Sequence, residues 1–401
     1  MRRAQFAVAA LPLVGGLLSC HEHDTPTEPR SIGDTFGRIW SVWVQKQALW
    51  PWARPVVNGA TVIFATGDDR LIARDRRTGG EVWSTQVTSV NDDPQVAGEN
   101  LVIAGGVVVA AVSRNTVGVD VSTGKQLWSY GAPSDTLIDD PGSAAMVAGV
   151  DLDADDSTVY VPAWGASLSA VNVRTGIARW VWRSPAGAQF RAGGKAARVS
   201  GDTVFQTVWQ CVNKNCNLAE GWVMALDRRT GAEFGKAVIP AYTSVVVFNG
   251  GIALYQNLVI VTGPGGQVWA IDRSTYQVAW HYGPTPALTS TVAGPVLAGN
   301  VVYTDGGDEH AVGLRASDGA VVWRAPIESQ ATKGLFVSAT RVYVPEAGVL
   351  NIIDRSSGRY VARIEQPNVG TNGSLFATPV TTFGSLVYAT VGGAAWCFVE
   401  P

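Results

Sequence analysis

The sequence predicts an all-β fold, an eight-bladed β-propeller of four-stranded antiparallel blades in which the last blade is closed by an N-terminal strand. A short phrase recurs along the chain at intervals of roughly 40 to 55 residues, which is room for four short strands and their turns. The 401 residues include 45 glycines and 15 tryptophans, and 16% of them are charged. The chain cannot be disordered, because its 46% of hydrophobic residues must bury a large core.

The recurring phrase runs from a turn Asp through a Thr-Gly pair to a Trp on the next strand. It is clearest at residues 75–83 and 120–128. Degenerate copies lie at residues 172–180, 227–234, 272–280, 315–323 and 354–362. An Asp side chain accepts hydrogen bonds from the backbone of such a turn, and glycine adopts the positive φ that the turn requires. These copies therefore predict seven blades.

The first complete unit shows the four expected strands of a blade in order. They are expected at residues 54–57, 61–66, 71–75 and 81–87, separated by short polar turns. An eighth unit is divided between the ends of the chain, since residues 374–399 supply three strands and residues 38–44 supply a Trp strand. Pairing these two segments closes the ring and leaves no free sheet edge between the first and last blades.

The Trp of each phrase is expected to lie flat between neighbouring blades and to dock one blade onto the next. An indole in such a position buries ~150–250 Å² of surface. We assign this docking role to Trp40, Trp83, Trp128, Trp180, Trp280 and Trp323. Phe234 and Ala362 replace the Trp in two copies, so weaker contacts are expected between those blades.

The first 36 residues predict export and a lipid anchor. Residues 1–19 are interpreted as a signal peptide, because two arginines precede an apolar run that is too short to span a bilayer. Residues 17–20 (LLSC) resemble a bacterial lipobox, which implies acylation of Cys20 and attachment to a membrane by lipid. An ordinary secretory signal with a chance cysteine is the alternative. Residues 20–36 are then a flexible tether, and residues 37–401 form a single propeller.

The charge of the chain bears on the kind of partner that it binds. Thirty Lys and Arg residues against 33 Asp and Glu residues give a formal net charge of −3. A protein that binds nucleic acid needs a basic surface to neutralise phosphates. The charge balance therefore argues against nucleic acid as a partner.

The least regular segments of the sequence are the loops that follow the second strands and the connections between blades. Both kinds are expected on one face of the ring, opposite the Thr-Gly turns, and irregular loops on a rigid scaffold commonly carry function. Five tryptophans fall in these segments and are the candidates for contacting a partner: Trp50, Trp52, Trp164, Trp209 and Trp222.

The largest insertion, at residues 209–222, lies in the fourth blade. Cys211 and Cys216 are expected to form a disulfide in an exported chain, which would stiffen this loop. Trp209 and Trp222 flank the insertion. They form either a rigid aromatic knob for a partner or strand residues that pack on their own blade, and both interpretations stay open.

A run of alternating carboxylates, Asp151, Asp153 and Asp155, has the spacing of the first ligands in a calcium loop. The sixth position, where such a loop needs Gly, is Asp156, and the twelfth, where it needs Glu, is Pro162. We therefore predict a solvated turn without a metal ion, with calcium binding as the alternative.

The repeat resembles that of the PQQ-type eight-bladed propellers, whose phrase is Ala-x-Asp-x-x-Thr-Gly-x-x-x-Trp, and the resemblance covers residues 37–401. Some members of that family are dehydrogenases with two adjacent cysteines over the quinone, whereas Cys211 and Cys216 are five positions apart. We therefore expect no PQQ or other cofactor and no catalytic residue. A PQQ-dependent dehydrogenase or a small-ligand-binding propeller is the alternative.

In size and predicted lipid anchor, the chain resembles the BamB-type outer-membrane assembly lipoproteins. This resemblance implies a non-catalytic scaffold in the bacterial cell envelope, attached to the outer membrane and facing the periplasm. It also implies an envelope protein as the partner, such as a subunit of the machinery that assembles β-barrels.

Overall fold

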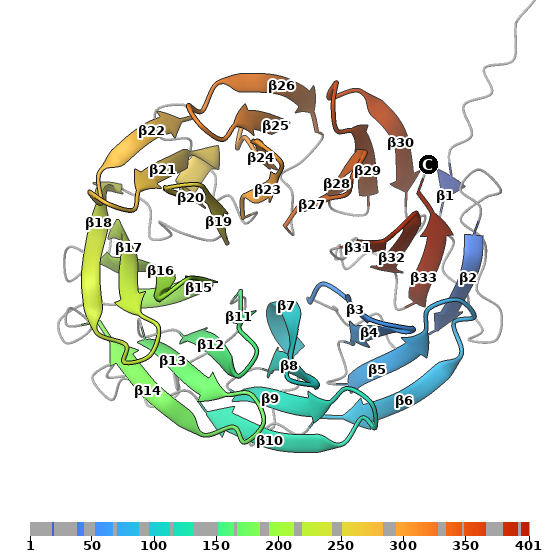
Figure 1. Ribbon diagram of the computed structural model, residues 1–401. Coiled ribbons are helices and arrows are strands. Elements are labelled where there is room, and N and C mark those ends of the chain that lie inside the picture. Colours follow the sequence, from blue (N-terminus) through green and yellow to red (C-terminus); the bar gives the residue numbers. More distant parts are fainter. Residues whose placement is uncertain are drawn as a thin grey trace, which may run out of the picture.

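The computed structural model describes sixteen segments of the chain. They are residues 18–19, 38–43, 53–66, 70–87, 96–112, 115–131, 151–163, 167–184, 192–211, 219–242, 251–283, 294–327, 334–346, 349–365, 380–391 and 394–400. These segments form a ring of eight antiparallel sheets, or blades, arranged around a central axis (Figure 1). Within them, no helix has the length and apolar composition needed to cross a membrane. The predicted all-β propeller is confirmed.

The first four blades are built from consecutive strands, with the first strand nearest the ring axis. Blade 1 contains β3 (Val56–Asn58), β4 (Thr61–Ala65), β5 (Arg70–Asp75) and β6 (Glu81–Gln86). Blade 2 contains β7 (Val96–Ala104), β8 (Val107–Val112), β9 (Asn115–Asp120) and β10 (Gln126–Gly131). Blade 3 contains β11 (Asp153–Ala154), β12 (Thr158–Ala163), β13 (Ser167–Asn172) and β14 (Ala178–Arg183). Blade 4 contains β15 (Ala192–Ser200), β16 (Thr203–Cys211), β17 (Ala219–Asp227) and β18 (Glu233–Tyr242).

Blades 5 to 7 follow the same plan. Blade 5 contains β19 (Ile252–Tyr255), β20 (Leu258–Thr262), β21 (Val268–Asp272) and β22 (Val278–Tyr282). Blade 6 contains β23 (Val296–Ala298), β24 (Val301–Asp305), β25 (His310–Arg315) and β26 (Val321–Pro326). Blade 7 contains β27 (Phe336–Val337), β28 (Arg341–Glu346), β29 (Val349–Asp354) and β30 (Tyr360–Glu365). The two-residue strand β1 (Leu18–Ser19), from the predicted signal peptide, pairs in parallel with β30.

Blade 8 is assembled from two distant parts of the chain. Its inner strands are β31 (Thr381–Phe383), β32 (Leu386–Val391) and β33 (Ala394–Val399), and its outer strand is β2 (Arg38–Trp43). β2 pairs antiparallel with β33, placing Trp40 opposite Cys397. The N-terminal strand therefore closes the ring, as predicted, and Figure 1 shows β2 at the rim beside β33.

The core of the protein lies between the blades. The middle strands are rich in apolar residues, because neighbouring blades cover both of their faces. β8 (VVVAAV) and β12 (TVYVPA) are buried at every position. In the described part of the chain, each of eight apolar clusters joins residues from two adjacent blades. The ring is therefore held together by sheet-on-sheet packing at every junction.

Six junctions are docked by a Trp from one blade and the turn Gly of the next. A Cβ atom on the Gly would lie 2.6 to 2.8 Å from the indole, so only glycine fits there. These glycines have φ between 70° and 73°, and each indole Nε1 donates a hydrogen bond of 2.8 to 3.1 Å to a carbonyl of the same turn. The pairs are Trp40 with Gly79, Trp83 with Gly124, Trp128 with Gly176, Trp180 with Gly231, Trp280 with Gly319 and Trp323 with Gly358.

At the junction of blades 4 and 5, the Trp and its receiving Gly are both replaced. Gly235 takes the register position of the Trp, opposite Ala225, and Tyr276 takes that of the turn Gly with φ of 58°. The ring of Tyr276 packs against Gly235 from the blade 5 side. The expectation that Phe234 replaces the Trp is wrong by one residue, and Phe234 instead points outward, 51% exposed. One position along a strand moves a side chain to the other face.

The junction of blades 7 and 8 departs from the pattern for a different reason. Ala362 takes the Trp position there, and no turn joins β33 to β2, because the two strands come from distant parts of the sequence. Across this junction, the Glu400 carboxylate accepts hydrogen bonds from the hydroxyl groups of Ser338, Thr340 (3.1 Å) and Tyr343 (3.0 Å) on blade 7.

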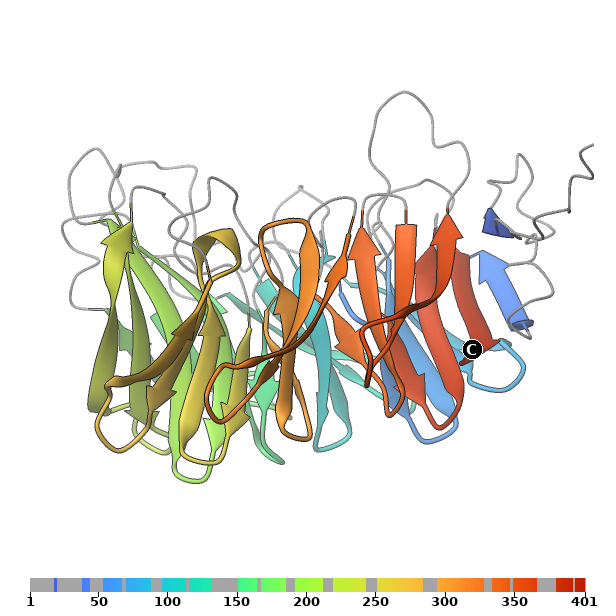
Figure 2. The same cartoon turned by 90° about the horizontal axis from the view of Figure 1, so that it is seen from above.

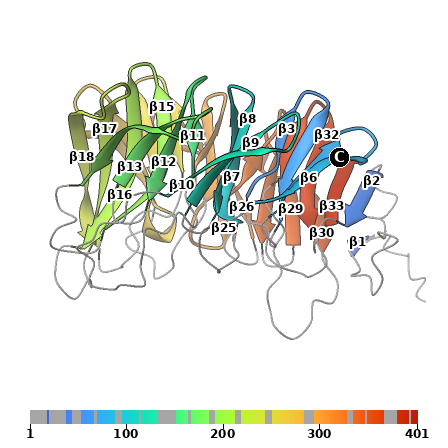
Figure 3. The same ribbon diagram turned by 90° about the horizontal axis from the view of Figure 1, so that it is seen from below.

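The two faces of the ring are formed by different loops (Figures 2 and 3). One face, which we name the turn face, carries the hairpin turns after the first strands and the Asp-Gly turns after the third strands. The opposite face, which we name the loop face, lies where the second strands end and the third strands begin. The turn face is at the bottom of Figure 2 and at the top of Figure 3.

Candidate protein-interaction surface

Blade 4 is the most extended blade of the ring. Its strands β16, β17 and β18 have 9, 9 and 10 residues, whereas the corresponding strands of the other blades have five or six. The β16–β17 pairing is continuous from Thr203 opposite Asp227 to Cys211 opposite Ala219. The additional residues lengthen the hairpin at the loop face. In the described part of the chain, β18 is therefore the longest outer strand.

The two tryptophans of blade 4 are buried in this hairpin. Trp209 is 6% exposed and belongs to the same apolar cluster as Trp269 of blade 5. Trp222 is 5% exposed and belongs to the same cluster as Trp182 of blade 3. They lie on opposite faces of the sheet, because side chains alternate along a strand. The interpretation of this pair as an exposed aromatic knob is therefore wrong, and the alternative of strand residues packing at their own blade applies.

Polar contacts hold the loop-face end of blade 4. Glu220 Oε1 accepts hydrogen bonds from Gln210 Nε2 (2.7 Å) and from the indole Nε1 of Trp222 (2.8 Å). The ammonium group of Lys236 lies 3.8 Å from the centre of the Trp222 ring, which is a cation–π contact. These contacts join three neighbouring strands and make this end of the blade a rigid platform.

The outward face of β18 is apolar and exposed. Phe234 and Val238 are 51% and 48% exposed, four residues apart, with Lys236 between them. Because Gly235 occupies the docking position, this strand has no Trp of its own to turn toward blade 5. We name Phe234, Lys236 and Val238 the β18 patch. A long outer strand with exposed apolar side chains is a surface suited to contact with another protein.

Other predicted candidates lie outside the described residues. These are Cys20 and three of the tryptophans, Trp50, Trp52 and Trp164. Cys211 is buried at the end of β16, whereas Cys216 lies outside the described residues, so the disulfide between them stays a prediction.

The predicted calcium alternative does not agree with the contacts of its carboxylates. Asp151 Oδ2 lies 2.7 Å from Arg198 Nη2, and Asp153 Oδ1 lies 3.6 Å from Arg198 Nη1. Asp155 turns away to cap its own hairpin, where it accepts hydrogen bonds from the amides of Ser157 and Thr158. The first two carboxylates are thus ion-paired to one guanidinium, and the three do not converge on a cation.

Two glycine-rich loops meet on the loop face. The 3₁₀ turn η3 (Pro264–Gly266) of blade 5 packs backbone to backbone against Gly306 and Gly307 of blade 6. His310 is the first residue of β25, directly after the blade 6 loop. Its Nδ1 lies 2.8 Å from the carbonyl oxygen of Asp308. His281, on the outer strand β22 of blade 5, stacks on Trp269 with ring centres 3.9 Å apart.

The PQQ group of the related dehydrogenases needs a set of side chains for its calcium ion. Across the segments that the structure describes, no three His, Cys, Asp or Glu side chains lie close enough together to hold a metal ion. The donor set of these segments does not fit the quinone–calcium pair, and we derive no chemistry through it.

A closed ring of four-stranded blades, docked by Trp on Asp-Gly turns, places the chain in the class of PQQ-like propellers. The match to a family model then identifies the family. The chain belongs to the family described as outer membrane protein assembly factor BamB, whose model matches residues 34–214 and 219–398. A comparison with curated proteins finds no match.

Solved structures of several proteins share this fold. BamB from Moraxella catarrhalis has a TM-score of 0.62 and 16% identity, covering 90% of this chain and 97% of its own. The computationally designed protein Ika8 has a TM-score of 0.66 and 15% identity, covering 90% and 99%. The quinohemoprotein alcohol dehydrogenase ADHIIG from Pseudomonas putida HK5 has a TM-score of 0.68 and 11% identity, covering 91% and 76%. At these identities, the likeness shows the fold alone.

Proposed function

We propose that this protein is a non-catalytic scaffold in the bacterial cell envelope that binds other proteins during β-barrel assembly at the outer membrane. The match to the BamB family model over nearly the whole propeller is the observation that carries the proposal. In this proposal Cys20 carries the lipid anchor, and the ring faces the periplasm.

We further propose that the β18 patch is a contact surface for the protein partner. Phe234 and Val238 present apolar side chains on the rim, beside the charged Lys236. The blade beneath them is rigid, since Trp209 and Trp222 pack it against both neighbours. An apolar surface on a rigid base loses little conformational entropy on binding.

Affinity capture from native membranes tests this proposal. The full chain with an affinity tag is compared with its Phe234→Asp/Val238→Asp variant, and the measured quantity is co-purification of the barrel-forming assembly subunit. We expect that subunit to co-purify with the parent chain, and we expect the amount recovered with the variant to be strongly reduced. A matched control is Leu127→Asp, because Leu127 is 42% exposed on the shorter outer strand β10. If the subunit never co-purifies, the assembly function is wrong; equal capture by the parent and the double variant would locate the contact elsewhere.

We propose that the protein works without PQQ or another cofactor. The test is reconstitution of the full chain with PQQ and Ca²⁺, followed by an assay of alcohol-dependent dye reduction. No activity above the protein-free control is expected. Alcohol-dependent reduction at a steady rate would instead support the dehydrogenase alternative.

A further inference from the structure

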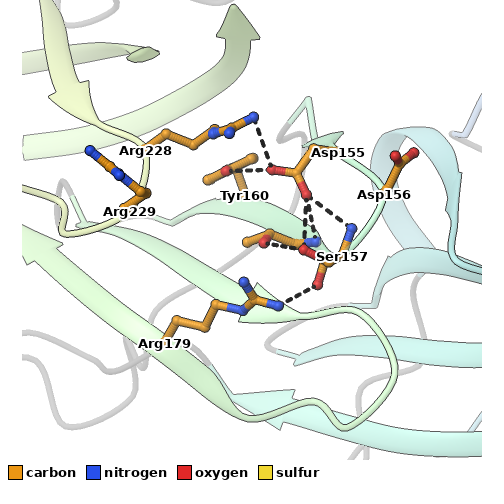
Figure 4. Close-up of a pocket in the computed structure, with 8 residues that line it drawn as sticks. Asp155, Asp156, Ser157, Tyr160, Arg179, Arg228 and Arg229 are labelled. Carbon is orange, nitrogen blue, oxygen red and sulfur yellow. Dashed lines mark hydrogen bonds and ion pairs between the residues drawn. The ribbon is translucent and has the colours of Figure 1, made fainter. Parts of the chain in front are cut away.

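A pocket of about 330 Å³ opens on the turn face between blades 3 and 4. Arg228 and Arg229 come from the Asp-Gly turn of blade 4, and Arg179 comes from the outer strand of blade 3 (Figure 4). Asp155 and Ser157, from the first hairpin of blade 3, lie between them. The volume is at the lower end of the range for small-ligand sites, which is ~300–1,000 Å³.

The docking Trp180 fixes the position of these arginines. Its indole Nε1 donates a 2.9 Å hydrogen bond to the carbonyl oxygen of Arg228, and its ring covers Gly231 of the same turn. Arg179 is the residue directly before Trp180, and its Nη2 donates to the carbonyl oxygen of Ser157 at 3.2 Å. The blade junction thus holds the two sides of the pocket in a fixed relationship before any ligand binds.

Arg228 differs from the arginines at the same position in three other Asp turns. Arg76 lies 3.8 Å from the Phe383 ring centre, Arg273 lies 5.3 Å from that of Phe205, and Arg355 lies 5.9 Å from that of Tyr303. These three guanidinium groups cover aromatic rings of the preceding blade. In blade 4 the guanidinium faces the pocket instead, with its Nη1 3.9 Å from Asp155 Oδ2.

Asp155 is already saturated with donors. It accepts hydrogen bonds from the amides of Ser157 and Thr158, both at 2.9 Å, and from the hydroxyl of Tyr160 at 2.9 Å. Although partial burial opposes it, this bonding lowers the pKa of Asp155, so the carboxylate stays ionised as a fixed part of the wall. This carboxylate carries one negative charge and can balance only one of the three guanidinium groups.

The guanidinium groups therefore exceed the available carboxylates. Asp156, at the right of Figure 4, is the other acid of the pocket, and Arg229 extends away from Asp155 at the pocket edge. Three guanidinium groups carry one positive charge more than the two carboxylates of the pocket can balance. A tetrahedral phosphate supplies negative charge and several acceptor oxygens for their N–H donors. The pocket also has room for a small organic group attached to the phosphate.

We propose that the pocket formed by Arg179, Arg228 and Arg229 binds a phosphomonoester group. The group comes either from a soluble phosphomonoester or from the headgroup of a phospholipid. This site is separate from the β18 patch, and it does not depend on the proposed scaffold function.

Calorimetry and vesicle flotation test the site on the full chain carrying Cys20→Ser, so that no acyl group can attach. The soluble probes are inorganic phosphate and glycerol 3-phosphate, titrated against a chloride reference of equal ionic strength. The vesicles are phosphatidylcholine with phosphatidic acid, compared with phosphatidylcholine alone. We expect saturable binding that weakens by about tenfold or more in Arg228→Gln and in Arg179→Gln. Arg77→Gln is the matched control, because Arg77 is exposed in the identical Asp-Arg-Arg-Thr-Gly turn of blade 1.

The outcomes separate the two sources of phosphate from failure of the proposal. Saturable heat with glycerol 3-phosphate and no flotation indicates a soluble ligand, and flotation with phosphatidic acid indicates a headgroup; either supports the site when the control keeps its binding. Absence of saturable binding to every probe at millimolar concentration overturns the proposal. Equal losses in Arg228→Gln and Arg77→Gln also overturn it, as does binding of an acidic peptide without binding of phosphate.

Discussion

The ring of Tyr276 lies against the backbone of Gly235, which is the reverse of the docking arrangement found at six other junctions. The aromatic group comes from the turn of blade 5, and the glycine comes from the outer strand of blade 4. At this junction the usual Trp of the outer strand is replaced by Gly235, and the usual Gly of the turn is replaced by Tyr276. The backbone of Tyr276 has a φ of 58°. This conformation costs of order 1 kcal/mol for a residue other than glycine.

This exchange predicts coupling between the two positions. Gly235→Trp alone is expected to destabilise the protein by ~1–3 kcal/mol, because the new side chain overlaps the Tyr276 ring. Tyr276→Gly alone removes aromatic packing. The double variant rebuilds the common Trp-on-Gly arrangement and is expected to be more stable than either single variant. Thermal midpoints of the four proteins measure this, and simple additivity of the two single losses would contradict it.

The docking tryptophans are expected to be major contributors to stability. Trp83 is buried against Gly124 and donates a hydrogen bond to the carbonyl of Val121. Trp83→Ala is expected to cost ~3–5 kcal/mol. Val82→Ala, at an exposed position on the same strand, is the control and is expected to change stability by about 0.5 kcal/mol or less. Urea unfolding measures both, and an unchanged midpoint for Trp83→Ala would refute the docking role.

The turn carboxylates predict a loss of stability in acid. The hydroxyl of Ser122 and the groups of Thr123 hold the pKa of Asp120 at about 2, below its ordinary value of 3.8. Ser356 and Ser357 likewise lower the pKa of Asp354 to about 2. A carboxyl with a lower pKa in the folded state stabilises the fold above the unfolded pKa. This contribution is lost as the pH falls from about 4 to about 2.

Thermal midpoints of the parent protein and of Asp120→Asn/Asp354→Asn test this between pH 5 and pH 2, a window that is roughly set by the ordinary and folded pKa values. The variant is expected to start from a lower midpoint and to show a flatter profile. Parallel profiles for the two proteins would show that Asp120 and Asp354 do not contribute to the loss of stability in acid.

Glu400 predicts a stabilising contact between blades 7 and 8. Its carboxylate accepts three hydroxyl hydrogen bonds, and both burial and the neighbouring Glu400 charge raise the pKa of Tyr343. Glu400→Gln is expected to cost ~1–3 kcal/mol, since hydrogen bonds to a charged acceptor are lost. A double-mutant cycle with Tyr343→Phe isolates the Tyr343–Glu400 term. A coupling energy near zero would show that the Tyr343–Glu400 hydrogen bond does not stabilise the contact between blades 7 and 8.

The thiol of Cys397 is expected to report on opening of blade 8. The side chain is free and buried, and burial raises its pKa to about 12. Iodoacetamide at mildly alkaline pH should therefore leave it unmodified in the folded protein and modify it after denaturation. Mass spectrometry of the peptide containing Cys397 measures the difference. Rapid modification under native conditions would show that β33 is accessible.

The repeat made the ring predictable, because the spacing from the turn residue to the docking Trp recurs in most blades and encodes a local turn and a local contact. The replacement in blade 4 was misplaced, since Phe234 is the aromatic residue near the expected position while register assigns that position to Gly235. Trp209 and Trp222 looked like loop residues, because nothing local shows that blade 4 continues its strands beyond the length used elsewhere.

The arginine pocket could not be found from the sequence. Arg179, Arg228 and Asp155 come from separate turns and strands, and each of them has the local pattern of a solvated turn residue. Docking of Trp180 across the blade junction brings them together. The sequence shows only that the Asp-Arg-Arg-Thr-Gly turn is the same in blade 1 and blade 4. The turn sequence does not show which residues of the neighbouring blade lie beside it.

Closure of blade 8 by the pairing of β2 with β33 also sets the order in which the blades fold. Each of the other blades comes from one continuous segment and can form without waiting for distant parts of the chain. β2 precedes all of these blades in the sequence but has no partner until β33, near the other end, has been completed. A pairing over such a separation is slow because of the entropy lost on closing the loop. The flanks of blades 1 and 7 stay uncovered until then, so the protein is most prone to aggregate just before β2 pairs with β33.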